Sequence, residues 1–230
     1  MTEPGLITLA GVGLLMGARH ALDADHLAAV STLVADRRDW RASGWIGFWW
    51  GCGHTAMLLA VGLAVLLLNL TIPAALAQGF EFLVGAMLVA LGGSLCAALI
   101  REGWHLHRHD HDGVAHVHWH SHRRGAAHQH SHEAPPARPL VVGMVHGLAG
   151  SAALMLLVVA SIHSVWEGLA YIVVFGLGSI AGMVGVGLLI GYPLAATGAS
   201  GPAARLVVRG LASLGSIGLG LTLMAKIAFG

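Results

Sequence analysis

Two histidines and two aspartates stand close together in a stretch that otherwise reads as membrane-spanning. The segment 6–34 is apolar except around His20, Asp23, Asp25 and His26. A charged side chain at the centre of a bilayer costs roughly 2.5–3.5 kcal/mol on insertion scales, so this group predicts a functional site. Imidazole nitrogen and carboxylate oxygen both bind divalent first-row metals. The sequence therefore predicts a metal site inside the membrane.

The spacing of these residues divides them into two sets. On a regular helix, with about 100° between residues, His20, Asp23 and His26 lie within an arc of about 120° and can face one cavity. Asp25 points away. It is either brought round by a local unwinding, or it holds an imidazole in the tautomer that binds metal. The segment is long for a single crossing, which predicts tilt or a break near the polar run.

Other histidines extend the candidate site. His54 follows Gly53, where the backbone of one helix can approach another or bend. It is either a further ligand or a hydrogen-bonded structural histidine. His146 lacks neighbouring carboxylates, and we leave open whether it lines the path, with Ser151 a weaker candidate. His163 ends an apolar run, where an interfacial role is expected.

A different concentration of histidine lies in the hydrophilic stretch 101–138. Tracts of this kind bind metal by composition, and this one has little apolar surface to fold around, so we expect it to be disordered without metal. Its affinity for Ni, Co, Cu or Zn should follow ligand chemistry. The alternatives are a solvated loop without a role and a proton-sensing loop. The predicted loop ligands are His105, His107, His109, His111, His116, His118, His120, His122, His128, His130 and His132.

Composition places the chain in a membrane. Hydrophobic residues make up 56% of it and charged residues 10%, whereas soluble proteins carry about 25% charged residues. Six apolar runs are long enough to cross about 30 Å of hydrocarbon. They cover 6–34, 44–69, 79–100, 139–162, 167–192 and 206–228. We therefore expect an all-α, polytopic membrane protein with six transmembrane helices, in contact with the lipid bilayer.

Some features carry less information. The net charge of +1 suggests no partner, and no nucleic acid is expected to bind. Cys52 and Cys96 lie in apolar runs without a CxxC spacing, so they are expected to be small buried residues and not a redox pair. The first helix has no basic region before it and no cleavage site after it, so we expect it to be retained and not to act as a signal peptide.

Arginines predict the orientation. They cluster after the first and third apolar runs and before the sixth, while segments 70–78 and 163–166 hold none. Under the positive-inside rule the basic segments are cytoplasmic. We therefore expect a cell (inner) membrane protein with both termini outside and the histidine-rich loop in the cytoplasm. The arginines are Arg37, Arg38, Arg41, Arg101, Arg108, Arg123, Arg124, Arg138, Arg205 and Arg209.

A weak internal repeat suggests an architecture. Glycine and histidine positions in the first three apolar runs recur in the last three at offsets of 125 or 126. They pair Gly17 and His20 with Gly143 and His146, Gly51 and Gly53 with Gly176 and Gly178, and Gly85 and Gly93 with Gly210 and Gly218. A unit of three spans must invert, and 3+3 inverted repeats are a transporter architecture. The predicted units are repeat 1–100, loop 101–138 and repeat 139–230.

These residues carry a resemblance. Arg19 and His20, followed by Asp25 and His26, resemble the signature helix of the nickel/cobalt transporter family, and 53–55 (Gly-His-Thr) resembles its second motif. Segments 146–153, 175–179 and 216–220 resemble the six-helix branch that accompanies urease genes, the urease accessory permeases. The resemblance implies transport of Ni(II), or of Co(II), along a path coordinated by His20, Asp25, His26 and His54.

The resemblance leaves the direction of transport open. Larger members of the family have two more helices and an aspartate-and-threonine motif ending in glutamate, where this chain has the histidine segment 146–148. The family contains uptake and efflux members. Of the two, we favour uptake here. With no P-loop, the chain should be a secondary permease and not an enzyme, with Ni(II) or Co(II) as cargo and no catalytic cofactor. A cytoplasmic metallochaperone is a candidate partner.

Three rival classes remain at this stage. A membrane metalloenzyme lacks its expected H-E-x-x-H motif. A haem protein could use two membrane histidines as axial ligands, but the neighbouring acids argue against it. A metal sensor or storage protein would depend on the loop alone. Deletion of residues 105–132 separates this last class from a permease, because a permease should still move metal.

Overall fold

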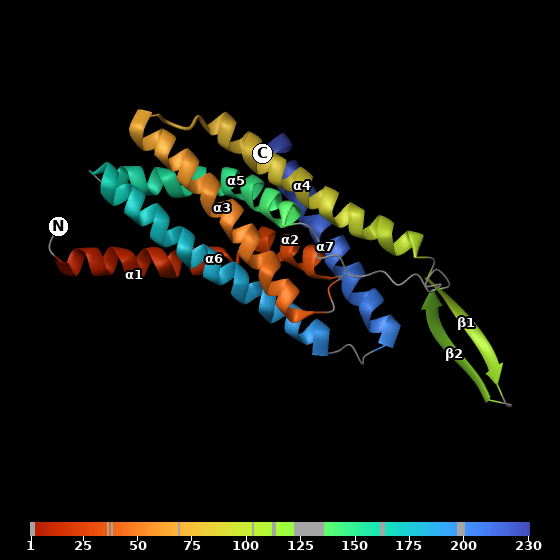
Figure 1. Ribbon diagram of the computed structural model, residues 1–230. Helices are drawn as coiled ribbons and strands as arrows, with labels where there is room; N and C mark the ends of the chain where they lie inside the picture. Colours follow the sequence, from red (N-terminus) through yellow and green to blue (C-terminus); the bar gives the residue numbers. More distant parts are fainter. Residues whose placement is uncertain are drawn as a thin grey trace.

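The computed structural model describes residues 3–35, 37, 39–68, 70–102, 104–111, 114–121, 136–161, 164–196 and 201–230. In these residues the chain forms seven helices and one pair of strands (Figure 1). The elements are α1 (Glu3–His20), α2 (Ala24–Val34), α3 (Trp40–Leu68), α4 (Ala74–Arg101), β1 (Trp104–His111), β2 (Val114–Ser121), α5 (Ala137–Ser161), α6 (Val165–Ala196) and α7 (Gly201–Phe229).

The helices confirm an all-α, multi-pass membrane protein. Four helical segments in the described part of the chain are long and apolar enough to span a bilayer. They are Trp40–Leu68, Ala74–Arg101, Val165–Ala195 and Ala203–Phe229. These segments contain four of the six predicted runs except for residue 69. The run 139–162 corresponds to α5, which ends at Ser161.

The first predicted span is not one continuous helix. Helix α1 ends at His20 and α2 begins at Ala24, and Asp23 between them has an extended conformation (φ −62°, ψ 148°). Two ionisable side chains within one turn are poorly accommodated on a helix surrounded by hydrocarbon, whereas a break can turn them toward the protein interior. The predicted break near the polar run is confirmed.

Helix α3 lies at the centre of the helix packing, against α5 and α6 (Figure 1). Helix α1 also packs on α6. Glycines allow these close approaches: a side chain at Gly17 would overlap the carbonyl oxygen of Phe175, and one at Gly143 would overlap that of Trp50. Small residues at helix interfaces are typical of membrane bundles. The four helices are thereby held close together around the break between α1 and α2.

Polar contacts join α4 to α7. The Ser213 hydroxyl donates to the Gly92 carbonyl and the Ser216 hydroxyl to the Leu88 carbonyl, each at 2.8 Å. Arg209 makes two hydrogen bonds with Glu102, at 2.7 and 2.8 Å. A bidentate arginine–carboxylate pair is among the stronger polar contacts in proteins. It ties the end of α4, next to the loop, to α7.

The strands β1 and β2 form an antiparallel hairpin within the histidine-rich stretch. We call Trp104–His111 and Val114–Ser121 the histidine hairpin. Histidines occupy paired positions in its register, namely His105↔His120, His107↔His118 and His109↔His116. This differs from the expected absence of structure. Histidine at every second position matches the two-residue period of a strand. A transition induced by metal stays a prediction.

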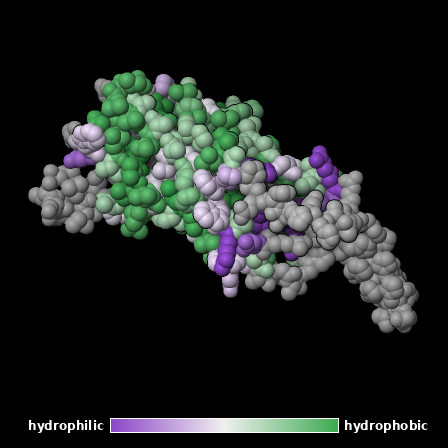
Figure 2. All heavy atoms as spheres, in the orientation of Figure 1, coloured by the Kyte–Doolittle hydropathy of each residue, from purple (hydrophilic) through white to green (hydrophobic). Residues whose placement is uncertain are grey.

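The outside of the helical body is largely apolar. Leu15, Leu67, Leu189 and Leu211 are each more than 60% exposed. Figure 2 shows apolar residues over most of the visible helical surface, with hydrophilic residues gathered mainly toward the end that bears the histidine hairpin. Exposed leucines in such numbers are expected where lipid, and not water, is the solvent. The helices are therefore embedded in a bilayer.

Candidate metal centre

The break between α1 and α2 brings together residues from four helices. His20 ends α1, Asp25 and His26 lie in the first turn of α2, His54 lies midway along α3, and His146 lies in α5. We call these five residues the histidine centre. Their side chains make two groups that could hold a metal ion, and both groups contain His26.

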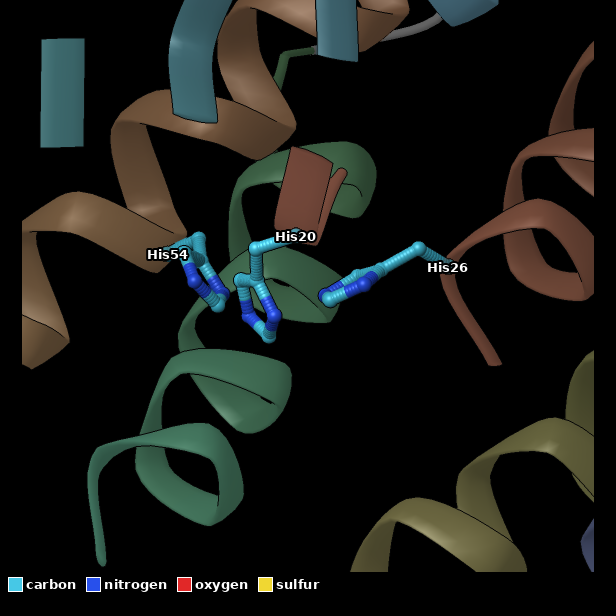
Figure 3. Close-up of side chains that lie close together, drawn as sticks. All are labelled: His20, His26 and His54. Carbon is cyan, nitrogen blue, oxygen red and sulfur yellow. The ribbon is translucent and has the colours of Figure 1, made fainter. Parts of the chain in front are cut away.

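The first group is made of three imidazoles. His20, His26 and His54 each offer a ring nitrogen, and these nitrogens lie within 4.8 Å of one another. The ring centroids are separated by 4.6 Å for His20 and His26, 5.2 Å for His20 and His54, and 5.4 Å for His26 and His54. Figure 3 shows the three rings directed into one shared space. Since metal–imidazole bonds are about 2.0–2.1 Å long for zinc, small rotations would place all three on one ion.

The second group combines a carboxylate with two imidazoles. Asp25, His26 and His146 again offer ligand atoms within 4.8 Å of one another. One Asp25 oxygen lies 3.7 Å from His26 Nδ1, and the other lies 3.7 Å from His146 Nε2. His146 Nδ1 lies 3.3 Å from the Val142 carbonyl oxygen. If Nδ1 carries the proton, it donates to that carbonyl and leaves the Nε2 lone pair for a ligand.

The histidines are buried without enough hydrogen-bond partners. His26, His54 and His146 are at most 2% exposed. Within the described residues, no hydrogen-bond partner is found for His20 Nε2, for His146 Nε2, or for either ring nitrogen of His26 and His54. Buried polar atoms are satisfied in the great majority of cases, so a cluster of exceptions needs an explanation. Coordination of a cation would satisfy these nitrogens together, and the donor set fits a first-row divalent metal.

The two aspartates have different surroundings, and the regular-helix expectation for them was wrong in part. The Asp23 carboxylate lies 2.7 Å from His20 Nδ1 and is 54% exposed. It is therefore placed to orient the His20 ring so that Nε2 faces the other histidines. Asp25, which one continuous helix would turn away from the face of His20, lies near His26 and His146, and the break gives α2 a direction different from that of α1. Of the two alternatives considered for Asp25, the structure has the local unwinding of the helix.

Two aromatic side chains beside the centre were missed in the sequence. The Trp50 ring centroid lies 5.4 Å from that of His26 and 5.2 Å from that of His146. Phe175 lies 5.6 Å from His20. A signal was present, because each aromatic directly precedes a Gly-x-Gly, at 51–53 and at 176–178. Trp50 also lies one helical turn before His54, which puts both on one face of α3.

For the other predicted site residues the structure describes the backbone at most. Among the loop ligands, His105, His107, His109, His111, His116, His118 and His120 belong to the histidine hairpin, where the structure describes the backbone alone. His122, His128, His130, His132 and His163 lie outside the described residues. Ser151 lies in α5, and its side chain is not described.

Comparisons with known proteins support the conclusion that the chain is a membrane protein. The family described as "Cytochrome C biogenesis protein transmembrane region" matches residues 27–222. The chain is 35% identical to the urease accessory protein UreH of Bacillus sp. (strain TB-90) over 193 residues, which are 84% of this chain and 80% of that protein.

Two relatives come from a plant. The chain is 28% identical over 230 residues to each of the chloroplast proteins FOR GROWTH AND FERTILITY 1 and 2 of Arabidopsis thaliana. The matches include 99% and 98% of this chain but 62% and 58% of those longer proteins. No solved structure matches the chain.

Proposed function

The chain belongs to the family of the cytochrome c biogenesis protein transmembrane region, and from this premise we propose that it is a permease for divalent transition metal ions. Ni(II) is the first candidate cargo and Co(II) the second. The observation that carries the proposal is the shared position of His26 in two ligand groups, each with two buried histidines and a third, partly buried residue. An ion could pass from one group to the other without losing contact with that imidazole.

The chemistry of the ligands favours a transition metal. Four imidazoles suit nickel, cobalt, copper or zinc, whereas magnesium and calcium prefer oxygen ligands. The Asp25 carboxylate supplies negative charge, which lowers the cost of taking a dication out of water. The similarity to a urease accessory protein and the resemblance to nickel/cobalt transporters both favour nickel.

Helix contacts support the 3+3 inverted repeat as part of the proposal. The contact of Gly17 with Phe175 has a counterpart in the contact of Gly143 with Trp50. The offset of 125 or 126 residues relates Gly17 to Gly143 and Trp50 to Phe175. Equivalent positions in the two repeats therefore make equivalent contacts. Gly53 against Leu140 and Gly178 against Leu14 are related in the same way. Two such units rocking about a central site would give alternating access.

The proposed topology has six transmembrane helices, with α1 and α2 together forming the first. Both termini lie on the outer side of the inner membrane, and the histidine-rich loop lies in the cytoplasm. The reason is that arginines occur in and beside this loop, and arginine-rich segments stay on the cytoplasmic side. In this arrangement the loop receives metal after uptake and can pass it to a metallochaperone. Export by the same path is the alternative direction.

Nickel flux into proteoliposomes of known protein orientation tests the proposal. Saturable flux is expected for the unmodified chain, loss of flux for His26→Ala, and continued flux after deletion of residues 105–132. Val30→Ala is a matched control, since Val30 is buried in α2 and lies outside both ligand groups. Absence of flux in every version, with tight binding confined to the loop, would instead indicate a membrane-anchored metal store.

A further inference from the structure

A cavity of about 620 Å³ lies outside the histidine centre. The end of α2 and the segment that follows it, the start of α3, the last part of α4 and the start of α5 all contribute to its walls. None of the five residues of the histidine centre lines it. The volume falls within the range of about 300–1,000 Å³ that is typical of small-molecule sites.

Two arginines line this cavity. Arg138 donates from Nη2 to the Ser94 hydroxyl at 3.2 Å, and Arg37 has a buried Nε with no hydrogen-bond partner among the described residues. Among the residues that the structure describes, neither guanidinium forms an ion pair with a carboxylate. Two like charges sharing one partly buried space favour an anion between them.

The rest of the lining is largely apolar and reaches the lipid-facing surface. Trp45 and Trp49 lie one turn apart on α3 and are 59% and 37% exposed. Leu95 and Ala98 line the cavity from α4. Tryptophan is enriched where hydrocarbon meets the headgroups of a bilayer. The cavity is therefore lined both by two cationic side chains and by two exposed tryptophans.

We propose that this cavity binds an anionic phospholipid, with Arg37 and Arg138 holding the phosphate group and an acyl chain lying along Trp45 and Trp49. Guanidinium groups bind phosphate oxygens through paired hydrogen bonds, and basic pockets between transmembrane helices bind acidic lipid headgroups. Inorganic phosphate shares the charge but would leave the aromatic wall uncovered. The lipid would bridge α2 and α5, which belong to different halves of the chain.

Native mass spectrometry of the purified full chain in detergent tests this site. The probes are phosphatidylglycerol and phosphatidylcholine with identical acyl chains, and inorganic phosphate. The unmodified chain is expected to retain phosphatidylglycerol in preference to phosphatidylcholine. Arg37→Gln and Arg138→Gln should each weaken phosphatidylglycerol binding by about fivefold, the contribution of one basic side chain at an anionic membrane surface. Arg41→Gln, an exposed arginine outside the cavity, is the control and should change binding little.

Every result of this experiment either supports the lipid site or overturns it. Trp45→Ser should lower retention of phosphatidylglycerol but not binding of inorganic phosphate. Equal retention of the two lipids by the unmodified chain would overturn the proposal, and this comparison needs no variant to fold. Equal losses in Arg41→Gln and the cavity variants would also overturn it. Displacement of the lipid by inorganic phosphate at similar concentration would indicate a site for free anions and would reject the lipid.

Discussion

The two histidine-rich regions of this chain are built in opposite ways. The histidine centre draws its five residues from four helices, and three separate parts of the sequence supply them: the break between α1 and α2, the middle of α3, and α5. The histidine hairpin takes its residues from one short stretch in which histidine alternates with other residues. The first arrangement exists only when the whole bundle is folded, whereas the second follows from local sequence.

This difference suggests that one region determines which metal is bound and the other how many metal ions are bound. Ligands fixed by several packed helices can favour one coordination geometry, because their positions cannot adjust freely to other ions. Closely spaced histidines in a local segment can offer many combinations of ligands, and affinity then follows the general order of metal–imidazole strength. We therefore expect the histidine centre to determine which metal crosses and the loop to determine how much metal is held.

His26→Ala should produce the largest effect, because it removes a ligand from both groups at once. In a chain lacking residues 105–132, we expect nickel affinity at the histidine centre to fall by more than about a hundredfold, beyond the 10–100-fold typical of losing an outer partner. Isothermal titration calorimetry of the purified protein measures this. Val30→Ala in the same background is the control, and an equal loss there would mean that packing alone is responsible.

The two aspartates should differ in the size of their effects. Asp25→Asn removes the carboxylate that faces His26 and His146, and we expect nickel flux to fall by about 10–100-fold. Asp23→Asn keeps a group that can accept from His20 Nδ1, so a smaller loss, near tenfold, is expected. Initial rates of flux in proteoliposomes give both numbers. The reverse order would place the metal beside Asp23, contrary to the geometry.

The positions of these aspartates show which features of the site could be predicted from the sequence and which could not. The length of the segment 6–34 and its polar run were enough to predict a break. They could not say which aspartate would face the other histidines, because that depends on the direction in which α2 leaves the break. On one continuous helix Asp25 would point away from the face shared by His20, Asp23 and His26, whereas here it joins His26 and His146 in one ligand group. Asp25 and His26 both lie in α2, so the extended conformation of Asp23 changes their direction relative to His20 in α1.

His146 illustrates a second limit. Its place in the internal repeat suggested a role, but without carboxylates around it the sequence could not decide. Its position depends on close packing of α5 against α3, where Gly147 lies against the carbonyl oxygen of His54. Contacts between distant segments of this kind cannot be read from local spacing. Trp50 and Phe175 were missed although each precedes a Gly-x-Gly.

Gly53→Ala tests whether helix packing positions the centre. An added Cβ would overlap the Leu140 carbonyl oxygen of α5, so we expect destabilisation by about 1–3 kcal/mol and displacement of the adjacent His54. Gly93→Ala is the matched control, because a Cβ there meets nothing within 4 Å. That change should be neutral or stabilising by up to about 1 kcal/mol, since alanine favours helix over glycine. Thermal unfolding in detergent compares the two variants.

Deletion of residues 105–132 should have the smallest effect on flux, and it tests the comparison from the other side. If the loop supplies capacity alone, initial nickel flux should stay within about twofold, whereas the number of nickel ions bound at saturation should fall sharply. This deletion leaves all five residues of the histidine centre in place, because none of them lies within residues 105–132. Flux by tracer uptake and bound nickel by elemental analysis are measured on the same preparation. Loss of flux together with binding would mean that metal reaches the path through the loop, so that the two regions form one functional unit.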